Sequence, residues 1–369
     1  MPRNKADKDG RCVLAARFSA IGDVAMAVPV LYSLCRSHPA LHVVFVTRPR
    51  LAQIFVNAPA NLTVVGADVD KGYRGLSGLK RLAGELRERY GVTDYVDLHN
   101  VLRTRLIGIS LKLSHIPVTT LVKDRSGRRA LTRSKNKVMS PLTTSRERYA
   151  EAFAAAGFPI EEAFDGLFGD SPGGKAPEAM FEALSAPKSE GERWIGIAPF
   201  AAHEGKVYPI DLMSRVVDAI AAEPQTRIFL FGGGSTEAAV FERWESRHPG
   251  KVTSLAGKRG GFAAELALMS HLDVMLTMDS GNMHLAAIAG TRVLSVWGAT
   301  HVNCGFAPWH HDGADRIESE LSCRPCSVFG KEPCRRGDLL CMRSIDPGEM
   351  ARRVMQAITP NKKQEKENG

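Results

Sequence analysis

Asp279-Ser280-Gly281-Asn282-Met283-His284 is the stretch of this chain that decides its fold. An apolar run, residues 272–278, precedes it, and an Ala-rich helical pattern, residues 285–289, follows it. The stretch therefore lies where a strand leads into a helix, whose first turn presents unpaired backbone N–H groups and partial positive charge. Phosphate groups bind at such turns, and ligands of open parallel sheets collect beyond the carboxyl ends of the strands. By themselves, the same residues fit a helix cap with ordinary Ser-Gly turn chemistry equally well.

Strand and helix patterns alternate on both sides of this stretch, which predicts α/β architecture with parallel sheets. The expected strands cover residues 12–18, 42–47, 61–65, 94–98, a short segment near 118, 194–199, 227–231, 252–255, 273–277 and 292–297. A stretch rich in Gly, Pro, Ser and Glu separates two such series. We therefore expect two Rossmann-like halves, with a division into an N-terminal domain (1–170), a linker (171–192), a C-terminal domain (193–345), a last helix (346–360) and a disordered tail (361–369).

The composition is that of an ordinary globular protein with an excess of positive charge. Hydrophobic residues make up 44% of the 369 residues, and the net charge is +9. Such a charge indicates an anionic partner: nucleic acid, a phosphorylated substrate or a membrane surface. Seven of the Lys and Arg residues lie between Lys123 and Lys137, a run that also fits a solvated loop. Few aromatic residues interleave with this run, which argues against nucleic acid as the partner.

No window of the sequence approaches the ~18 uninterrupted apolar residues of a membrane-spanning helix. We therefore expect a cytoplasmic protein whose contact with any membrane is at most peripheral.

Four of the seven cysteines form a cluster with the spacing C-x2-C-x7-C-x6-C. In a cytosolic chain, metal ligation competes with free thiols as the reason for such a cluster. The four thiolates could hold a structural zinc ion. Only one pair has the usual CxxC spacing, so free or redox-sensitive structural thiols stay the favoured alternative. The cluster consists of Cys323, Cys326, Cys334 and Cys341.

The first predicted strand leads into Ser19-Ala20-Ile21-Gly22-Asp23 and then into a helix. Gly22 permits a tight turn and close approach of a ligand. Asp23 would lie in the first helical turn, where the local field favours its ionised form. An ionised carboxylate in a cleft can accept a proton from an attacking hydroxyl. The alternative is an aspartate that only complements the helix dipole.

The second series of elements begins in the same way. Strand 194–199 enters a loop that holds Lys206, which could neutralise a diphosphate as negative charge develops on a leaving group. It could equally be an exposed loop lysine. The next strand ends in three glycines, and Glu237 after them could bind ribose hydroxyls. Because the full GxGxxG spacing is absent, this glycine turn is a weak signal. Lys258 follows the next strand, in a Gly-rich loop suited to lining an adenine.

These motifs occur in one order: S-x-x-G-D, then A-P-x-A-x(4)-K-x-[WY]-P, G-x-x-x-E and D-[ST]-G-x-x-H. In this order and spacing the chain resembles the ADP-heptose:lipopolysaccharide heptosyltransferase family, glycosyltransferase family 9, from about Val13 to Ile358. The cysteine-rich segment and the Ser344-Ile345-Asp346-Pro347 that follows it also look like the C-terminal region of many members.

The resemblance implies a GT-B fold, two Rossmann-like domains that face each other across a cleft. It implies acceptor binding by the first domain, donor binding by the second, and inversion without a catalytic metal. It assigns Asp23 as general base and Lys206 as the lysine that contacts the donor diphosphate. Donor-binding positions would be Gly22, Ala201, Glu237, Lys258, Asp279, Ser280, Gly281 and His284. We expect acceptor contacts from Ser19, Arg103, Arg105, Arg125 and Arg128, because core acceptors carry phosphates and carboxylates.

Two departures from the family pattern leave the donor sugar open. Phe200 replaces a glycine that is common after the Ala-Pro, and Tyr208 replaces the usual tryptophan. The resemblance nevertheless implies an inverting transferase that uses ADP-heptose and a lipopolysaccharide core or lipid A acceptor. The alternatives are a family 9 transferase of another nucleotide sugar, and a non-catalytic GT-B protein that binds nucleotide or anionic lipid.

Overall fold

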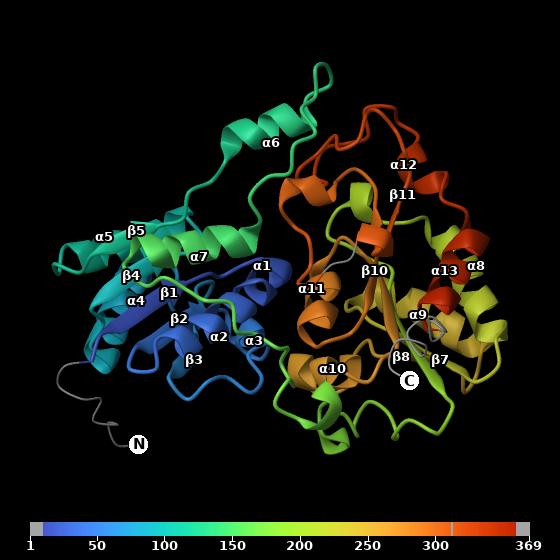
Figure 1. Cartoon of the computed structure of the whole chain (residues 1–369), viewed down its shortest axis with the longest axis horizontal. Helices are drawn as coiled ribbons and strands as arrows, with labels where there is room; N and C mark the ends of the chain where they lie inside the picture. Colours follow the sequence, from blue (N-terminus) through green and yellow to red (C-terminus); the bar gives the residue numbers. More distant parts are fainter. Residues whose placement is uncertain (1–9, 311–312, 359–369) are drawn as a thin grey trace, which may run out of the picture. The chain divides into compact units, whose positions relative to one another are not determined.

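The computed structural model describes residues 10–310 and 313–358, which form two compact units with one parallel sheet each (Figure 1). Among the described residues, the N-terminal unit comprises 10–125, 143–170 and 261–263. The C-terminal unit comprises 126–142, 171–260 and 264–358. The predicted tail, residues 361–369, lies outside the described residues. The predicted linker, residues 171–192, carries two short 3-10 turns and is part of the C-terminal unit.

The sheet of the N-terminal unit has five parallel strands in the order β3-β2-β1-β4-β5. These strands are β1 Cys12–Ala16, β2 His42–Thr47, β3 Leu62–Gly66, β4 Asp94–Asp97 and β5 Val118–Thr120. Every residue of β1 is buried, as expected of a central parallel strand that is covered on both faces. In the register of the sheet, Leu14 of β1 lies opposite Val44 on one side and Tyr95 on the other.

The helices of the first half of the chain follow these strands in turn. They are α1 Ile21–Ala25, α2 Ala27–Ser37, α3 Pro49–Ala52, α4 Gly75–Tyr90, α5 Leu102–Lys112, α6 Arg125–Thr132 and α7 Ser145–Ala155. Helices α4 and α5 contribute Leu82 and Ile107 to one apolar core with β1 and Tyr95. This packing fixes the start of each helix at the carboxyl edge of the sheet.

The sheet of the C-terminal unit has six parallel strands in the order β11-β10-β9-β6-β7-β8. These strands are β6 Arg193–Ala198, β7 Thr226–Leu230, β8 Val252–Ser254, β9 Val274–Met278, β10 Val293–Trp297 and β11 Arg316–Glu318. Its helices are α8 Ile210–Ala222, α9 Ser235–Arg247, α10 Gly261–Met269, α11 Gly281–Ile288, α12 Leu340–Arg343 and α13 Pro347–Ala357, and the short turns are Pro172–Gly174, Glu178–Met180, Glu204–Lys206, Val302–Cys304 and Gly313–Asp315. The first residues of α10 group with the N-terminal unit.

Residues 126–142, which we call the crossing segment, leave the N-terminal unit after β5 and return to it at α7. The guanidinium of Arg128 lies 6.0 Å from the ring centre of Phe306 and 5.3 Å from that of Phe329. The Nζ of Lys137 donates hydrogen bonds to the carbonyls of Cys323 and Pro325 at 2.7 and 2.9 Å. The basic run therefore packs, in large part, on the C-terminal unit.

None of the helices among the described residues has the length and apolar character needed to cross a membrane.

Candidate functional site

The N-terminal unit holds Asp23 in the first turn of α1, directly after β1. Its Oδ2 lies 2.7 Å from Arg17 and accepts a hydrogen bond of 3.0 Å from the backbone N–H of Ala20. The hydroxyl of Tyr149 in α7 donates to the backbone carbonyl of Asp23. Ser19 and Gly22 lie half-buried in the same turn. The carboxylate is thus fixed by contacts on several sides, in a position that keeps 23% of its side chain exposed.

Two side chains from neighbouring strand ends surround this carboxylate. Arg17 follows β1 and also donates to the carbonyl of Leu98 at 2.7 Å. His99, after β4, accepts from the backbone N–H of Phe18 through Nδ1 at 3.4 Å, which assigns its proton to Nε2. Burial, followed by the positive charge of Arg17, lowers the pKa of His99 to about 3. The imidazole beside Asp23 is therefore neutral at physiological pH.

The predicted acceptor residues do not all gather in one place. Arg103 pairs with Asp70 at 2.9 Å, and Asp70 also pairs with Arg48 at the end of β2. Arg105 donates to the side-chain oxygen of Asn100 at 2.7 Å. Arg125 lies at the start of α6 and belongs to the N-terminal unit, whereas Arg128 lies in the crossing segment of the other unit.

The predicted donor residues of the C-terminal unit follow four adjacent strands, in the order β9-β6-β7-β8. Because all four strands are parallel, their carboxyl ends meet at one edge of the sheet, where ligands of such folds bind. Ala201 and Lys206 follow β6, Glu237 follows β7, Lys258 follows β8, and Asp279 follows β9.

Lys206 and Asp279 are in direct contact at this edge. The Nζ of Lys206 lies 2.9 Å from Oδ2 of Asp279, and the hydroxyl of Thr300 donates to the same oxygen at 2.7 Å. Their side chains are 15% and 4% exposed. A buried carboxylate needs such partners, because an unpaired charge in the interior is costly. The ion pair therefore fixes an ammonium group where the ends of β6 and β9 meet.

A glycine in the cysteine-rich loop lies against the stem of this lysine. Gly330 has a φ of +75°, and a Cβ atom placed there would come within 2.6 Å of Lys206 Cγ. The backbone of the lysine loop is fixed too, since Ala299 N–H donates to the carbonyl of Gly205 at 2.8 Å. The cysteine-rich loop thus helps to position Lys206.

Helix α11 begins directly after Asp279. Ser280 is its N-terminal cap residue in an extended conformation, and its hydroxyl lies 3.3 Å from that of Thr277. Gly281 is the first helical residue, and His284 is buried one turn later. The predicted phosphate-binding turn is therefore a helix N-terminus at the carboxyl edge of the sheet.

Glu237 and Lys258 make contacts with the protein itself. Glu237 accepts a hydrogen bond of 2.6 Å from the backbone N–H of Gly233, which closes the glycine turn after β7. The Nζ of Lys258 lies 3.4 Å from the carbonyl of Leu184. Both side chains lie at the predicted edge, and their roles toward a nucleotide stay predictions.

The two positions that depart from the family pattern have structural partners. Phe200 packs against Phe241 with ring centres 5.7 Å apart. Tyr208 is fully buried, and its hydroxyl donates to the carbonyl of Ile345 at 2.7 Å. Burial raises the pKa of Tyr208 to about 12. Tyr208 thus connects the lysine loop to the segment before α13, away from solvent.

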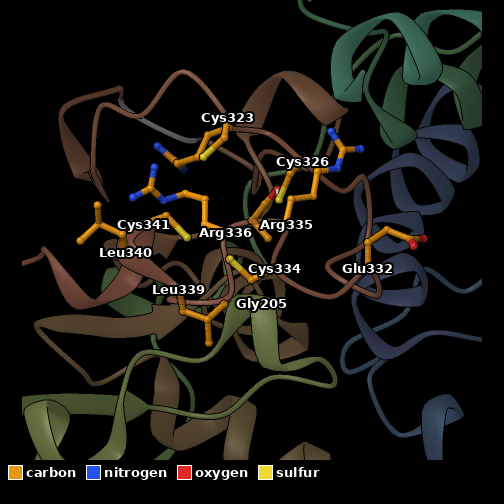
Figure 2. Close-up of a pocket in the computed structure, with 12 residues that line it drawn as sticks. Gly205, Cys323, Cys326, Glu332, Cys334, Arg335, Arg336, Leu339, Leu340 and Cys341 are labelled. Atoms are coloured by element: carbon orange, nitrogen blue, oxygen red, sulfur yellow. Dashed lines mark hydrogen bonds between the residues drawn. The ribbon is translucent and has the colours of Figure 1, made fainter. Parts of the chain in front are cut away.

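The cysteine cluster lines one pocket of the C-terminal unit, as Figure 2 shows. The pocket is lined by all four clustered thiols and three guanidinium groups, from Cys323, Cys326, Cys334, Cys341, Arg324, Arg335 and Arg336. Burial raises the pKa of Cys341 to about 11, whereas the pKa of Cys334 is lowered because backbone N–H groups outweigh its burial. Within residues 10–310 and 313–358, no three His, Cys, Asp or Glu side chains are placed so as to hold a metal ion. The choice between a zinc site and free thiols at this cluster stays a prediction.

Sequence reasoning missed three residues that shape these sites. In the sequence Arg17 shows only as a charge within an apolar run, yet in the structure it pairs with Asp23. Thr300 follows β10, and a small polar residue just past a strand end was the available signal. Gly330 gave no signal, because its contact with Lys206 depends on the path of a loop without regular structure.

The sequence profile of glycosyltransferase family 9 (heptosyltransferase) matches residues 85–333. The chain is 22% identical over 175 residues to lipooligosaccharide heptosyltransferase 2 of Campylobacter jejuni, covering 46% of this chain and 53% of that protein. It is 29% identical over 123 residues to lipopolysaccharide heptosyltransferase 3 of Escherichia coli, covering 33% and 36%. The matched part thus spans about half the length of the Campylobacter protein. The profile match confirms the predicted family.

Solved structures with the same fold cover nearly the whole chain. The E. coli ADP-heptose lps heptosyltransferase II has a TM-score of 0.69 at 15% identity, over 94% of this chain and 98% of that one. A family 9 glycosyltransferase from Veillonella parvula also has a TM-score of 0.69 at 15% identity, over 95% and 98%. At such identities the likeness concerns the fold alone. Together with the two parallel sheets, it confirms the predicted GT-B class.

Proposed function

Because the chain belongs to glycosyltransferase family 9 (heptosyltransferase), we propose that it transfers a heptose from ADP-heptose to a lipopolysaccharide core acceptor. The observation that carries the proposal is the Lys206–Asp279 ion pair beside the first turn of α11. An ammonium group and a helix N-terminus at one sheet edge suit a diphosphate. The buried carboxylate that holds the lysine would turn to the sugar hydroxyls when donor binds.

In the proposed step, the hydroxyl oxygen of the acceptor forms a bond to the anomeric carbon of the heptose. The bond from that carbon to the diphosphate oxygen breaks, ADP leaves, and the configuration at the carbon inverts. Asp23 accepts the proton of the attacking hydroxyl, while Lys206 and the N–H groups of Ser280 and Gly281 stabilise the charge that develops on the diphosphate. Glu237 would bind the ribose and Lys258 the adenine side of the donor. No catalytic metal takes part in this step.

The acceptor side of the proposal uses the N-terminal unit. Ser19, Arg103, Arg105 and Arg125 would contact the phosphates and carboxylates of the core, with Arg128 contributed by the crossing segment. Such acceptors are anchored in lipid, so we propose a peripheral contact with the inner membrane.

The base assignment is tested with Asp23→Asn. This change keeps the size of the side chain but removes the group that accepts a proton, so transfer should fall roughly 10²–10⁴-fold. Binding of ADP should stay unchanged. The assay incubates protein, ADP-heptose and a Kdo-lipid A acceptor and measures the product by mass spectrometry. The matched control is Glu88→Gln, an exposed carboxylate of α4 in the same unit. Turnover near that of the control would show that Asp23 is not the base.

The nature of the nucleotide separates the proposal from its alternatives. A ligand that binds the native state raises its apparent stability. ADP should therefore raise the melting temperature more than UDP or GDP at equal concentration. A preference for UDP or GDP would indicate another nucleotide sugar. Stabilisation by ADP without any transfer to a set of core acceptors would indicate a binding protein.

A structural zinc ion at the four clustered cysteines is a separate part of the proposal. Bound zinc would deprotonate the thiols and order the loop that carries Gly330. Elemental analysis of the purified protein tests it: one zinc per chain supports the site, and fully reactive thiols without metal refute it.

A further inference from the structure

Helix α5 has two apolar faces, and among the residues that the structure describes only one of them is covered. Thr104, Ile107, Gly108 and Leu111 are buried against the sheet of the N-terminal unit. At 100° per residue these four positions point in one direction. A soluble helix that covers a sheet normally carries charged and polar residues on the opposite side.

On α5 the opposite side is apolar instead. Leu102, Ile109 and the capping residue Leu113 are 73%, 56% and 80% exposed, and Leu106 between them is partly buried. These positions follow the spacing i, i+4, i+7 and i+11, so they form one stripe about 16 Å long. A single exposed leucine needs no explanation, but an aligned stripe of this kind marks an interaction surface.

The flanks of the stripe are basic. Arg105 and Lys112 lie on one side of it, and Arg103, which pairs with Asp70 at 2.9 Å, lies on the other, as the helical spacing dictates. Between Asp97 and Asp124 the chain has four Lys or Arg residues and no acid. The long stems of these side chains can lie along an apolar layer while their charges reach phosphate groups.

The surface continues beyond the first turn of α5. The side-chain amide of Asn100 donates to the carbonyl of Leu121 at 2.8 Å, and Lys123 donates to the carbonyl of Asn100 at 2.9 Å. These bonds hold Val122, which is 78% exposed, and the ammonium of Lys123 next to the start of the helix. Apolar and basic groups are thus combined over the whole surface.

We propose that this surface, Leu102, Leu106, Ile109, Leu113 and Val122 with their basic flanks, docks on an anionic lipid bilayer. An apolar stripe with Lys and Arg at its sides is the pattern of a helix that lies in the membrane interface. A protein partner with an apolar groove would not require flanks of a single charge sign.

The location of the surface suits a lipid-anchored acceptor, and in this respect the inference rests on the proposed function. The loop from Asp97 to Asn100 leads directly into α5, and its His99 contacts the turn that precedes Asp23. Docking through α5 would place the candidate base near the lipid surface from which the acceptor projects.

The test is sedimentation of the full chain with vesicles, without donor or acceptor. Wild-type protein should bind to vesicles of phosphatidylcholine with 30% phosphatidylglycerol. It should bind much less to vesicles of phosphatidylcholine alone. Arg105→Gln with Lys112→Gln should lower the partition coefficient roughly 25-fold, because each basic residue near an anionic surface contributes a factor of about five. Ile109→Ser with Leu113→Ser should lower it roughly tenfold or more.

The matched control for the apolar change is Ile109→Val with Leu113→Met, which keeps both side chains apolar and should bind like wild type. The proposal would be overturned if the serine variant bound anionic vesicles as well as wild type does. It would also be overturned if wild type bound equally well to vesicles without anionic lipid. Light scattering completes the test: a wild-type dimer that the serine variant dissociates, without vesicle binding, would assign the surface to a second copy of the chain. Loss of vesicle binding by the serine variant, with intact transfer to a soluble acceptor, would leave the proposed reaction standing, because Ile109 and Leu113 have no part in it.

Discussion

The neutral histidine beside Asp23 links the candidate base to the stability of the N-terminal unit. In an unfolded chain His99 titrates near pH 6.5, whereas in the folded unit burial and Arg17 lower its pKa to about 3. Above pH 6.5 the ring is neutral in both states, so it contributes no pH dependence. As the pH falls from 6.5 towards 3, only the unfolded chain takes up the proton. The free energy of unfolding must therefore decrease over this range.

This dependence predicts the behaviour of His99→Gln, which keeps an acceptor for the N–H of Phe18 but does not titrate. Between pH 7.5 and pH 5, wild type should lose about 2 kcal/mol more of its free energy of unfolding than the variant does. Urea unfolding followed by circular dichroism at the two pH values measures the difference. Parallel losses in the two proteins would show that His99 is protonated in the folded state as readily as in the unfolded one.

Single residues show where sequence reasoning succeeds. Asp23, Lys206 and Asp279 could be placed at strand ends, because strand and helix periods are local properties of the sequence. The contact between Lys206 and Asp279 could not be predicted, since it depends on β6 pairing with β9 across the 75 residues that separate the two strands.

At the scale of elements, the glycine at position 330 provides the sharpest test of how the lysine is positioned. Gly330→Ala places a Cβ atom within 2.6 Å of Lys206 Cγ, in a backbone with positive φ. The methyl group should displace the lysine stem and weaken ADP binding in the same direction as Lys206→Ala. Roughly 1 kcal/mol of stability should also be lost from backbone strain alone.

Gly337→Ala is the matched control for this change. Gly337 lies in the same loop with a φ of +78°, but a Cβ atom there would meet no heavy atom within 4 Å. The two variants should thus share the strain and differ only in the contact with Lys206. Isothermal titration with ADP measures the difference, and equal affinities in both variants would remove Gly330 from the positioning of the lysine.

Elements differ in how far the sequence determines them. All ten predicted strands are present, because most are apolar runs bounded by turn residues. Strand β11 was missed, since Arg316, Ile317 and Glu318 are too few residues to show a period. Helix α6 was missed because its basic residues fit a solvated loop equally well. Its partners, Phe306 and Phe329, lie far away in the sequence.

At the scale of the whole molecule, the crossing segment is a stretch between two elements of the N-terminal unit, β5 and α7, that itself packs within the C-terminal unit. Its contacts there combine stacking of Arg128 with hydrogen bonds from Lys137, and the backbone N–H of Leu142 donates to the carbonyl of Asn303 at 2.9 Å. A stacked guanidinium contributes about 0.5–1 kcal/mol at an exposed site and more where it is desolvated. A few such contacts can hold a segment that has only one fully buried apolar side chain, Leu131.

The combined variant Arg128→Ala with Lys137→Ala should therefore release this segment without unfolding either sheet. The expected result is faster hydrogen exchange over residues 126–142, by roughly tenfold if about 1.4 kcal/mol of local stability is lost, with unchanged exchange in the strands. Arg129→Ala is the control, because it removes a charge from the same helix at an exposed position. Peptide-resolved mass spectrometry reports both regions in one experiment. If the double variant and the control exchange alike, these two side chains do not hold the segment. If exchange rises in the strands as well, the segment is part of the cooperative core of the C-terminal unit.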